Sequence, residues 1–124
     1  MTLPESNDIR LLAEVGFLAA ARGDIRNAEA IFRGLERVRP AANFPYVGLA
    51  AALMNGGRLD EAVQVLDRGL TSVGPQDQAE LQAFRALVLQ LGGRTSESRR
   101  ALVLAGDLPL ARAMRGERTE MVQT

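Results

Sequence analysis

The sequence contains no cysteine, histidine, lysine or tryptophan. Without cysteine it has no disulfide framework, no thiolate nucleophile and no zinc-finger spacing. Without histidine it lacks the commonest general base and the commonest transition-metal ligand. Without lysine it has neither Schiff-base chemistry nor the lysine of a phosphate-binding loop. We therefore expect a protein that is not an enzyme and that uses no metal ion or cofactor.

The sequence also lacks an excess of charge and any long hydrophobic run. Fifteen arginines balance fifteen acidic residues, whereas a large nucleic-acid footprint needs net positive charge. No stretch approaches the roughly 20 apolar residues that span a bilayer, and the N-terminus has no secretory signal pattern. Arginine as the only strongly basic residue type points to a GC-rich bacterial genome. We expect a bacterial, cytoplasmic protein that neither binds nucleic acid nor inserts into a membrane.

Hydrophobic residues make up 47% of the 124 residues and charged residues 24%, as in a globular domain with a core. Turn signals at Gly23-Asp24, Gly56-Gly57 and Gly92-Gly93 separate segments whose apolar residues recur at helical spacing. No alternating run typical of a strand occurs. The pattern predicts helices over residues 8–22, 25–38, 44–55, 59–72, 77–91 and 95–105. It also predicts a shorter helix with Asp107 as its N-cap and Pro109 in its first turn.

The helices pair into repeats. Gly23, Gly57 and Gly93 are 34 and 36 residues apart. Each is followed at fixed spacing by a small residue and then a bulky one, which are Ala28 and Phe32, Ala62 and Leu66, and Ser98 and Leu102. A period near 34 in helix–turn–helix units is the signature of the tetratricopeptide repeat (TPR). Over roughly residues 9–112 the chain resembles this family. A plain four-helix bundle is the alternative, but it has no reason to place glycines at this period.

The resemblance implies an all-α fold, a TPR-like helical solenoid of three helix–turn–helix hairpins plus a short C-terminal capping helix. The repeats would span about residues 9–42, 43–76 and 79–112 of a single domain over 9–115, with an N-terminal segment, 1–8, and a polar tail, 116–124. Small residues would let helices approach closely, and these are Gly16, Ala28, Ala50, Ala62 and Ala86. The last helix, with Leu108, Leu110 and Met114, would cover the open end of the stack.

In the TPR family the first helix of each pair lines a concave groove. By the motif, the resemblance assigns to this groove Arg10, Ala13, Phe17, Ala20 and Ala21, then Phe44, Val47, Ala51, Met54 and Asn55, then Glu80, Ala83, Leu87, Gln90 and Leu91. The set is mostly apolar, and a soluble monomer rarely exposes such a patch without a use for it. It favours the amphipathic helix of a partner protein. The alternative is that this protein fills its own groove, with residues 1–8, the last helix or a second copy in a homodimer.

A short three-repeat chain with an apolar groove also resembles the small chaperones of bacterial type III secretion systems, which export virulence proteins. This resemblance implies a cytosolic chaperone that sequesters an amphipathic helix of a secreted subunit, such as the needle protein, or of a co-chaperone. Burial of that helix would block premature polymerisation before export. The alternative is a scaffolding or assembly subunit of the TPR class with a permanent partner or self-association.

Overall fold

The computed structural model describes residues 6–116. Over this range the chain forms seven helices and no strand, which are α1 (Ser6–Ala21), α2 (Ile25–Val38), α3 (Phe44–Asn55), α4 (Leu59–Leu70), α5 (Pro75–Leu91), α6 (Thr95–Ala105) and α7 (Pro109–Met114). The first six agree with the predicted ranges to within two residues at each end. The predicted all-α fold is confirmed. Residues 1–5, and 117–124 of the predicted tail, lie outside the described residues.

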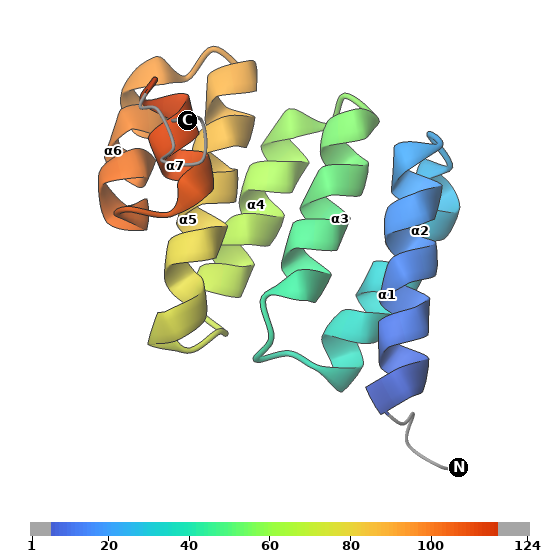
Figure 1. Cartoon of the computed structure of the whole chain (residues 1–124). Helices are drawn as coiled ribbons and strands as arrows, with labels where there is room; N and C mark the ends of the chain where they lie inside the picture. The colour runs from blue at the N-terminus through green and yellow to red at the C-terminus, as the bar shows by residue number, and fades with distance from the viewer. Residues whose placement is uncertain (1–5, 117–124) are drawn as a thin grey trace, which may run out of the picture.

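The helices stand side by side in a row, with α1 and α2 at one end and α5 and α6 at the other (Figure 1). Each of the first five helices packs against the next along the chain, and α3 also packs against both α1 and α5. This is the contact pattern of three stacked hairpins, because a closed bundle would bring the two ends of the row together. The predicted hairpins α1–α2, α3–α4 and α5–α6 are therefore confirmed.

The three hairpins turn in the same way. Gly23, Gly57 and Gly93 have φ angles of 80°, 76° and 77°, in the left-handed region that favours glycine. The N–H group of the residue after each glycine donates to the carbonyl oxygen five residues earlier, at 2.8 to 2.9 Å. These bonds form the Schellman motif that satisfies carbonyl groups at the end of a helix. The glycine period seen in the sequence is thus a period of identical helix ends.

Phe32 of α2 holds the first two hairpins together. Its side chain is fully buried, and its ring packs edge-to-face on that of Phe17, with centroids 4.8 Å apart. A Cβ added at Gly16 would lie 2.9 Å from the ring, and one added at Gly48 would overlap it. Gly16 of α1 and Gly48 of α3 therefore let both helices close on Phe32. The close approach at Gly16 agrees with the prediction that small residues let the helices come together, whereas Gly48 was not identified from the sequence.

The second hairpin, α3–α4, packs around Tyr46 of α3, which is buried. Its hydroxyl group donates to the carbonyl oxygen of Pro40 at 2.6 Å, so the one polar atom of the ring is satisfied. A Cβ added at Gly69 of α4 would lie 2.7 Å from the Tyr46 ring. The other predicted small residues of this core are also fully buried, namely Ala28, Ala50, Ala62 and Ala86.

The last helix begins later than predicted. α7 starts at Pro109 with Leu108 in the N-cap position, and no side chain caps it. Leu108 is extended, with ψ of 147°, as the residue before a proline prefers. The Asp107 carboxylate faces Arg115 instead, at 3.8 Å. The prediction of Asp107 as N-cap was therefore wrong, because the restriction imposed by Pro109 places the cap one residue later.

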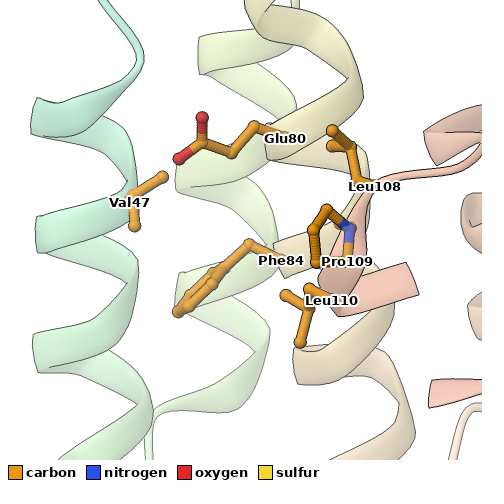
Figure 2. Close-up of a pocket in the computed structure, with 7 residues that line it drawn as sticks. Val47, Glu80, Phe84, Leu108, Pro109 and Leu110 are labelled. Atoms are coloured by element: carbon orange, nitrogen blue, oxygen red, sulfur yellow. The ribbon is translucent and has the colours of Figure 1, made fainter. Parts of the chain in front are cut away.

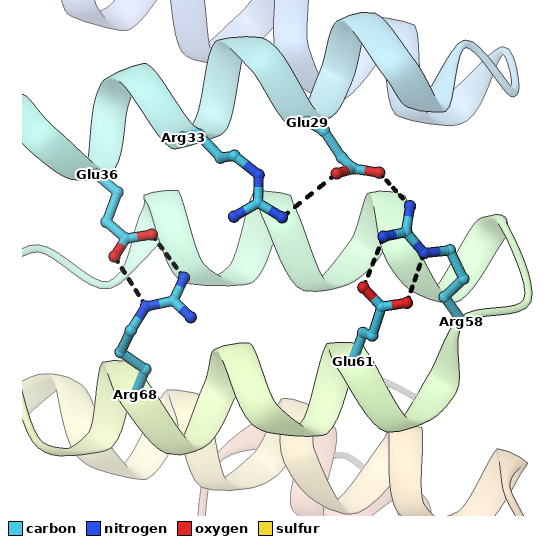
Figure 3. Close-up of polar contacts among 6 residues, drawn as sticks. All are labelled: Glu29, Arg33, Glu36, Arg58, Glu61 and Arg68. Carbon is cyan, nitrogen blue, oxygen red and sulfur yellow. Dashed lines mark hydrogen bonds and ion pairs between the residues drawn. The ribbon is translucent and has the colours of Figure 1, made fainter.

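Ion pairs join α2 to α4 on the outer side of the stack (Figure 3). Arg68 donates two hydrogen bonds to Glu36, at 2.8 and 2.9 Å. Arg58, which precedes α4, bonds to Glu61 through two nitrogens at 2.6 and 2.8 Å and also contacts Glu29. The hydrogen bonds from Arg58 hold the pKa of Glu61 below its ordinary value. Such exposed pairs contribute little to the free energy of unfolding, so they support the packing rather than cause it.

Candidate functional site

An apolar pocket lies between α3, α5 and the beginning of α7. It has a volume of about 290 Å³, and its lining is Val47, Glu80, Ala83, Phe84, Leu108, Pro109 and Leu110. Figure 2 shows Glu80 and Phe84 on α5 facing Val47 on α3, with the residues that begin α7 along the opposite side. This volume and composition suit one or two aliphatic or aromatic side chains of a partner.

One carboxylate marks the edge of the pocket. Glu80 is the only ionisable residue in the lining. Its Oε2 accepts a hydrogen bond of 2.8 Å from Nδ2 of Asn43, the residue that precedes α3. This bond orients the Glu80 side chain across the space between α5 and α3. The site therefore combines an apolar pocket with a single, positioned negative charge.

Three of the residues assigned to the groove by the motif meet in this pocket, Val47, Glu80 and Ala83. Six others lie outside the pocket, on the first helices of the hairpins, and are half-buried or exposed. They are Ala13, Phe17, Phe44, Ala51, Met54 and Leu87. Ala21 and Leu91, at the ends of α1 and α5, are exposed, and so is Gln90. The pocket therefore collects assigned residues from the second and third repeats only.

The remaining assigned positions make contacts within the chain. Ala20 is only 3% exposed and packs with Ala28 and Ala52, so it offers almost no surface to a partner. Asn55 donates to the carbonyl oxygen of Ala20 at 3.1 Å, which ties the end of α3 to the end of α1. Arg10 pairs with Glu14 on its own helix, at 3.6 Å. Ala20 and Asn55 therefore join α1 to α3, and none of the three residues lines the pocket.

The TPR motif missed Phe84 and three residues at the start of α7, although the alternative that the protein fills its own groove had named the last helix. Phe84 follows Ala83 directly, and the TPR motif does not assign that position to the groove. Leu108, Pro109 and Leu110 were expected to cover the end of the stack, but α7 packs on α5 and these residues form a wall of the pocket. The signal available in the sequence was Pro109 between Leu108 and Leu110, directly after the turn at Gly106-Asp107. The residues that begin α7 therefore form one side of the pocket.

Within residues 6–116, no group of three or more acidic side chains stands close enough together to hold a metal ion. None of the helices described is both long enough and apolar enough to cross a bilayer.

Comparison with models of known protein families found no match, and comparison with the curated proteins found none either. In fold, the chain is similar to the type III secretion translocator chaperone SycD of Yersinia enterocolitica. The TM-score is 0.74 at 19% identity, over 90% of this chain and 85% of the SycD chain. It is also similar to a chain of the CopN-Scc3 complex, with a TM-score of 0.69 at 17% identity, over 90% of this chain and 67% of the other. The resemblance in fold to TPR-like secretion chaperones is confirmed.

Proposed function

We propose that this chain is a non-catalytic, cytoplasmic chaperone of a bacterial type III secretion system, which holds an amphipathic helix of a secreted subunit before export. The observation that carries the proposal is the apolar pocket between α3, α5 and α7. It is supported by the likeness in fold to SycD, which is a translocator chaperone. The CopN-Scc3 structure supports a protein as the partner, because it contains a chain of this fold in a complex.

The groove suits a helix better than an isolated side chain. An amphipathic helix presents an apolar residue every three or four positions along one face. One such residue would enter the pocket beside Val47 and Phe84, and its neighbours would pass over Ala51 and Met54. Met54 is unbranched, so it can adapt to partners of different shape. Each square ångström of apolar surface removed from water contributes about 25 cal/mol, which would keep an aggregation-prone stripe covered until export.

The test is co-expression with candidate secretion subunits, followed by a pull-down and by titration of the purified pair. Val47→Asp should weaken binding by at least about tenfold, because it places an unpaired carboxylate against an apolar helix. Val103→Asp is the matched control, since Val103 is 79% exposed on α6 and lies outside the pocket. Circular dichroism should show unchanged helicity in both variants. A folded Val47→Asp variant that binds as well as the parent protein would contradict the groove.

The alternative, a scaffold that satisfies its own groove, has one observation in its favour, because Leu108 and Leu110 already line the pocket. The two functions differ in their thermodynamics. A chaperone should gain about 2.7 kcal/mol of apparent stability at a client concentration one hundred times the Kd, by mass action. A scaffold without room for a client should melt at the same temperature with and without it.

A further inference from the structure

One carboxylate in the candidate site has no cation to balance it. Within residues 6–116, Glu80 is the only glutamate that forms no ion pair with an arginine. The glutamates that do form one are Glu14, Glu29, Glu36, Glu61 and Glu97. Arg85 is the only arginine on α3 or α5, and it pairs with Asp67 of α4 at 2.7 Å. The negative charge at the edge of the pocket therefore stays unbalanced in the described part of the chain.

Helix formation does not account for this charge. Asp77, earlier on α5, lies in the first turn, where the helix dipole favours an acidic residue. Glu80 lies one turn further along, where that effect has faded. The facing helix, α3, carries no acidic or basic residue. An occupant that covered the Glu80 carboxylate without pairing with it would bury an unpaired charge, which is unfavourable, so the site points to a partner that supplies a cation.

Asn43 holds this carboxylate in place. Asparagine in front of a helix commonly caps it with its side chain, but Asn43 makes no capping hydrogen bond to α3. Its Nδ2 instead donates to Oε2 of Glu80 at 2.8 Å, and the Glu80 side chain reaches from α5 toward Val47 on α3 (Figure 2). A carboxylate can accept about four hydrogen bonds, so Oε1 and part of Oε2 remain available to a further donor.

We infer that the groove selects its client by charge. The client helix lies along α5 and carries arginine or lysine one turn from the apolar residue that enters the pocket, and this cation pairs with Glu80. Glu80 and Phe84 are four residues apart on one face of α5, about 6 Å along the helix axis. Residues one turn apart on a client helix have the same separation, so an apolar side chain beside Phe84 brings its neighbour beside Glu80. The inference rests on the proposed function, because the client must occupy the pocket.

The charge acts on the choice of client more than on the strength of binding. A cation beside Glu80 gains charge-assisted hydrogen bonds, whereas an acidic residue there is repelled. Because Glu80 is exposed, water and salt screen the pair, and it changes the affinity by no more than about fivefold. Apolar burial in the pocket supplies the affinity, and Glu80 decides between client helices of similar apolar shape.

Three synthetic peptides test the selection by charge. Each is an alanine-rich amphipathic helix of about 20 residues with a leucine stripe. They differ only at the two positions one turn before and one turn after the central leucine, which are both lysine, both glutamine or both glutamate, so that one of the two lies beside Glu80 in either direction of the helix. At low salt the lysine peptide should bind the parent protein about fivefold more tightly than the glutamate peptide, with the glutamine peptide between them. This preference should shrink as salt is added.

Variants assign the preference to Glu80. Glu80→Gln should bind the three peptides with nearly equal affinity, and Glu80→Arg should prefer the glutamate peptide. Asp8→Asn is the matched control, because it removes the same charge from an exposed position on α1 outside the pocket, and it should keep the preference of the parent protein. Asn43→Ala should reduce the preference but leave the affinity for the glutamine peptide unchanged, as expected of a positioning residue.

The outcomes separate this inference from the groove itself. If the glutamine peptide binds the parent protein more tightly than Val47→Asp, and the lysine and glutamate peptides bind the parent protein equally well, the groove stands and the selection by charge is refuted. The same conclusion follows if Glu80→Gln and Asp8→Asn lower the preference equally. If the glutamine peptide does not bind the parent protein at all, the proposed groove fails and this inference fails with it.

Discussion

The packing of two helices on the Phe32 ring predicts a graded response to the substitution of glycine by alanine. At Gly48 an added Cβ would overlap the ring, and Phe32 is fully buried with no free space to receive it. At Gly16 the added carbon would lie 2.9 Å from the ring, against the 3.4 Å of an ordinary contact, so a shift of about 0.5 Å would relieve it. At Gly34, on the exposed side of α2, nothing lies within 4 Å.

The expected magnitudes follow from two opposing effects. Alanine is favoured over glycine within a helix by about 0.8–1 kcal/mol, whereas overpacking a core costs about 1–3 kcal/mol. Gly34→Ala should therefore raise the free energy of unfolding by up to about 1 kcal/mol. Gly16→Ala should be nearly neutral or lower it by about 1 kcal/mol. Gly48→Ala should lower it by about 2 kcal/mol or more, because the ring must move by a larger distance.

Urea unfolding followed by circular dichroism measures these differences, and 1 kcal/mol corresponds to roughly 4 °C in Tm. Phe32→Leu in the Gly48→Ala background should recover part of the loss, which a double-mutant cycle would show as a coupling energy of about 1 kcal/mol or more. If Gly48→Ala were as stable as Gly34→Ala, Phe32 would not lie between α2 and α3. The spacing of the helices that line the groove would then need another explanation.

Three further predictions concern the stack and its polar contacts. Ala62→Leu should lower the free energy of unfolding by about 1–3 kcal/mol, because Ala62 is fully buried at a helix crossing, and a urea titration would reveal the loss. Ser98→Ala should cost about 0.5–1.5 kcal/mol in the same assay, since the buried Ser98 hydroxyl donates to the carbonyl oxygen of Ala86 at 2.8 Å. Stability should also fall in acid. The pKa of Glu61 is lowered from 4.5 in the folded state by Arg58, so its contribution is present above that value and is lost as the pH drops through the folded-state pKa. Arg58→Gln should flatten this dependence in urea midpoints measured from pH 7 to pH 3, and an unchanged slope would contradict it.

The sequence predicts the candidate site only in outline. The TPR motif identified the helices that line the groove, and Val47, Glu80 and Ala83 do meet in one pocket. It missed Leu108 and Leu110, because the direction in which α7 leaves the third hairpin depends on how it packs on α5. Gly48 was missed for a similar reason, since nothing local distinguishes it from a glycine such as Gly34. What separates the two is the Phe32 ring from another helix.

The sequence by itself determined the first six helices, the turns that end in glycine and the number of repeats, because helical periodicity and left-handed glycines are properties of short segments. It could not determine which apolar faces are covered. Leu11, Val15 and Leu18 form an exposed stripe on α1 but follow the same spacing as their buried counterparts in α3, and residue type alone does not distinguish the two sets. Only the order of the hairpins in space decides that α3 lies against a preceding hairpin while α1 stands at the end of the row. Burial depends on neighbours brought from elsewhere in the chain, so the exposed stripe is a consequence of tertiary structure.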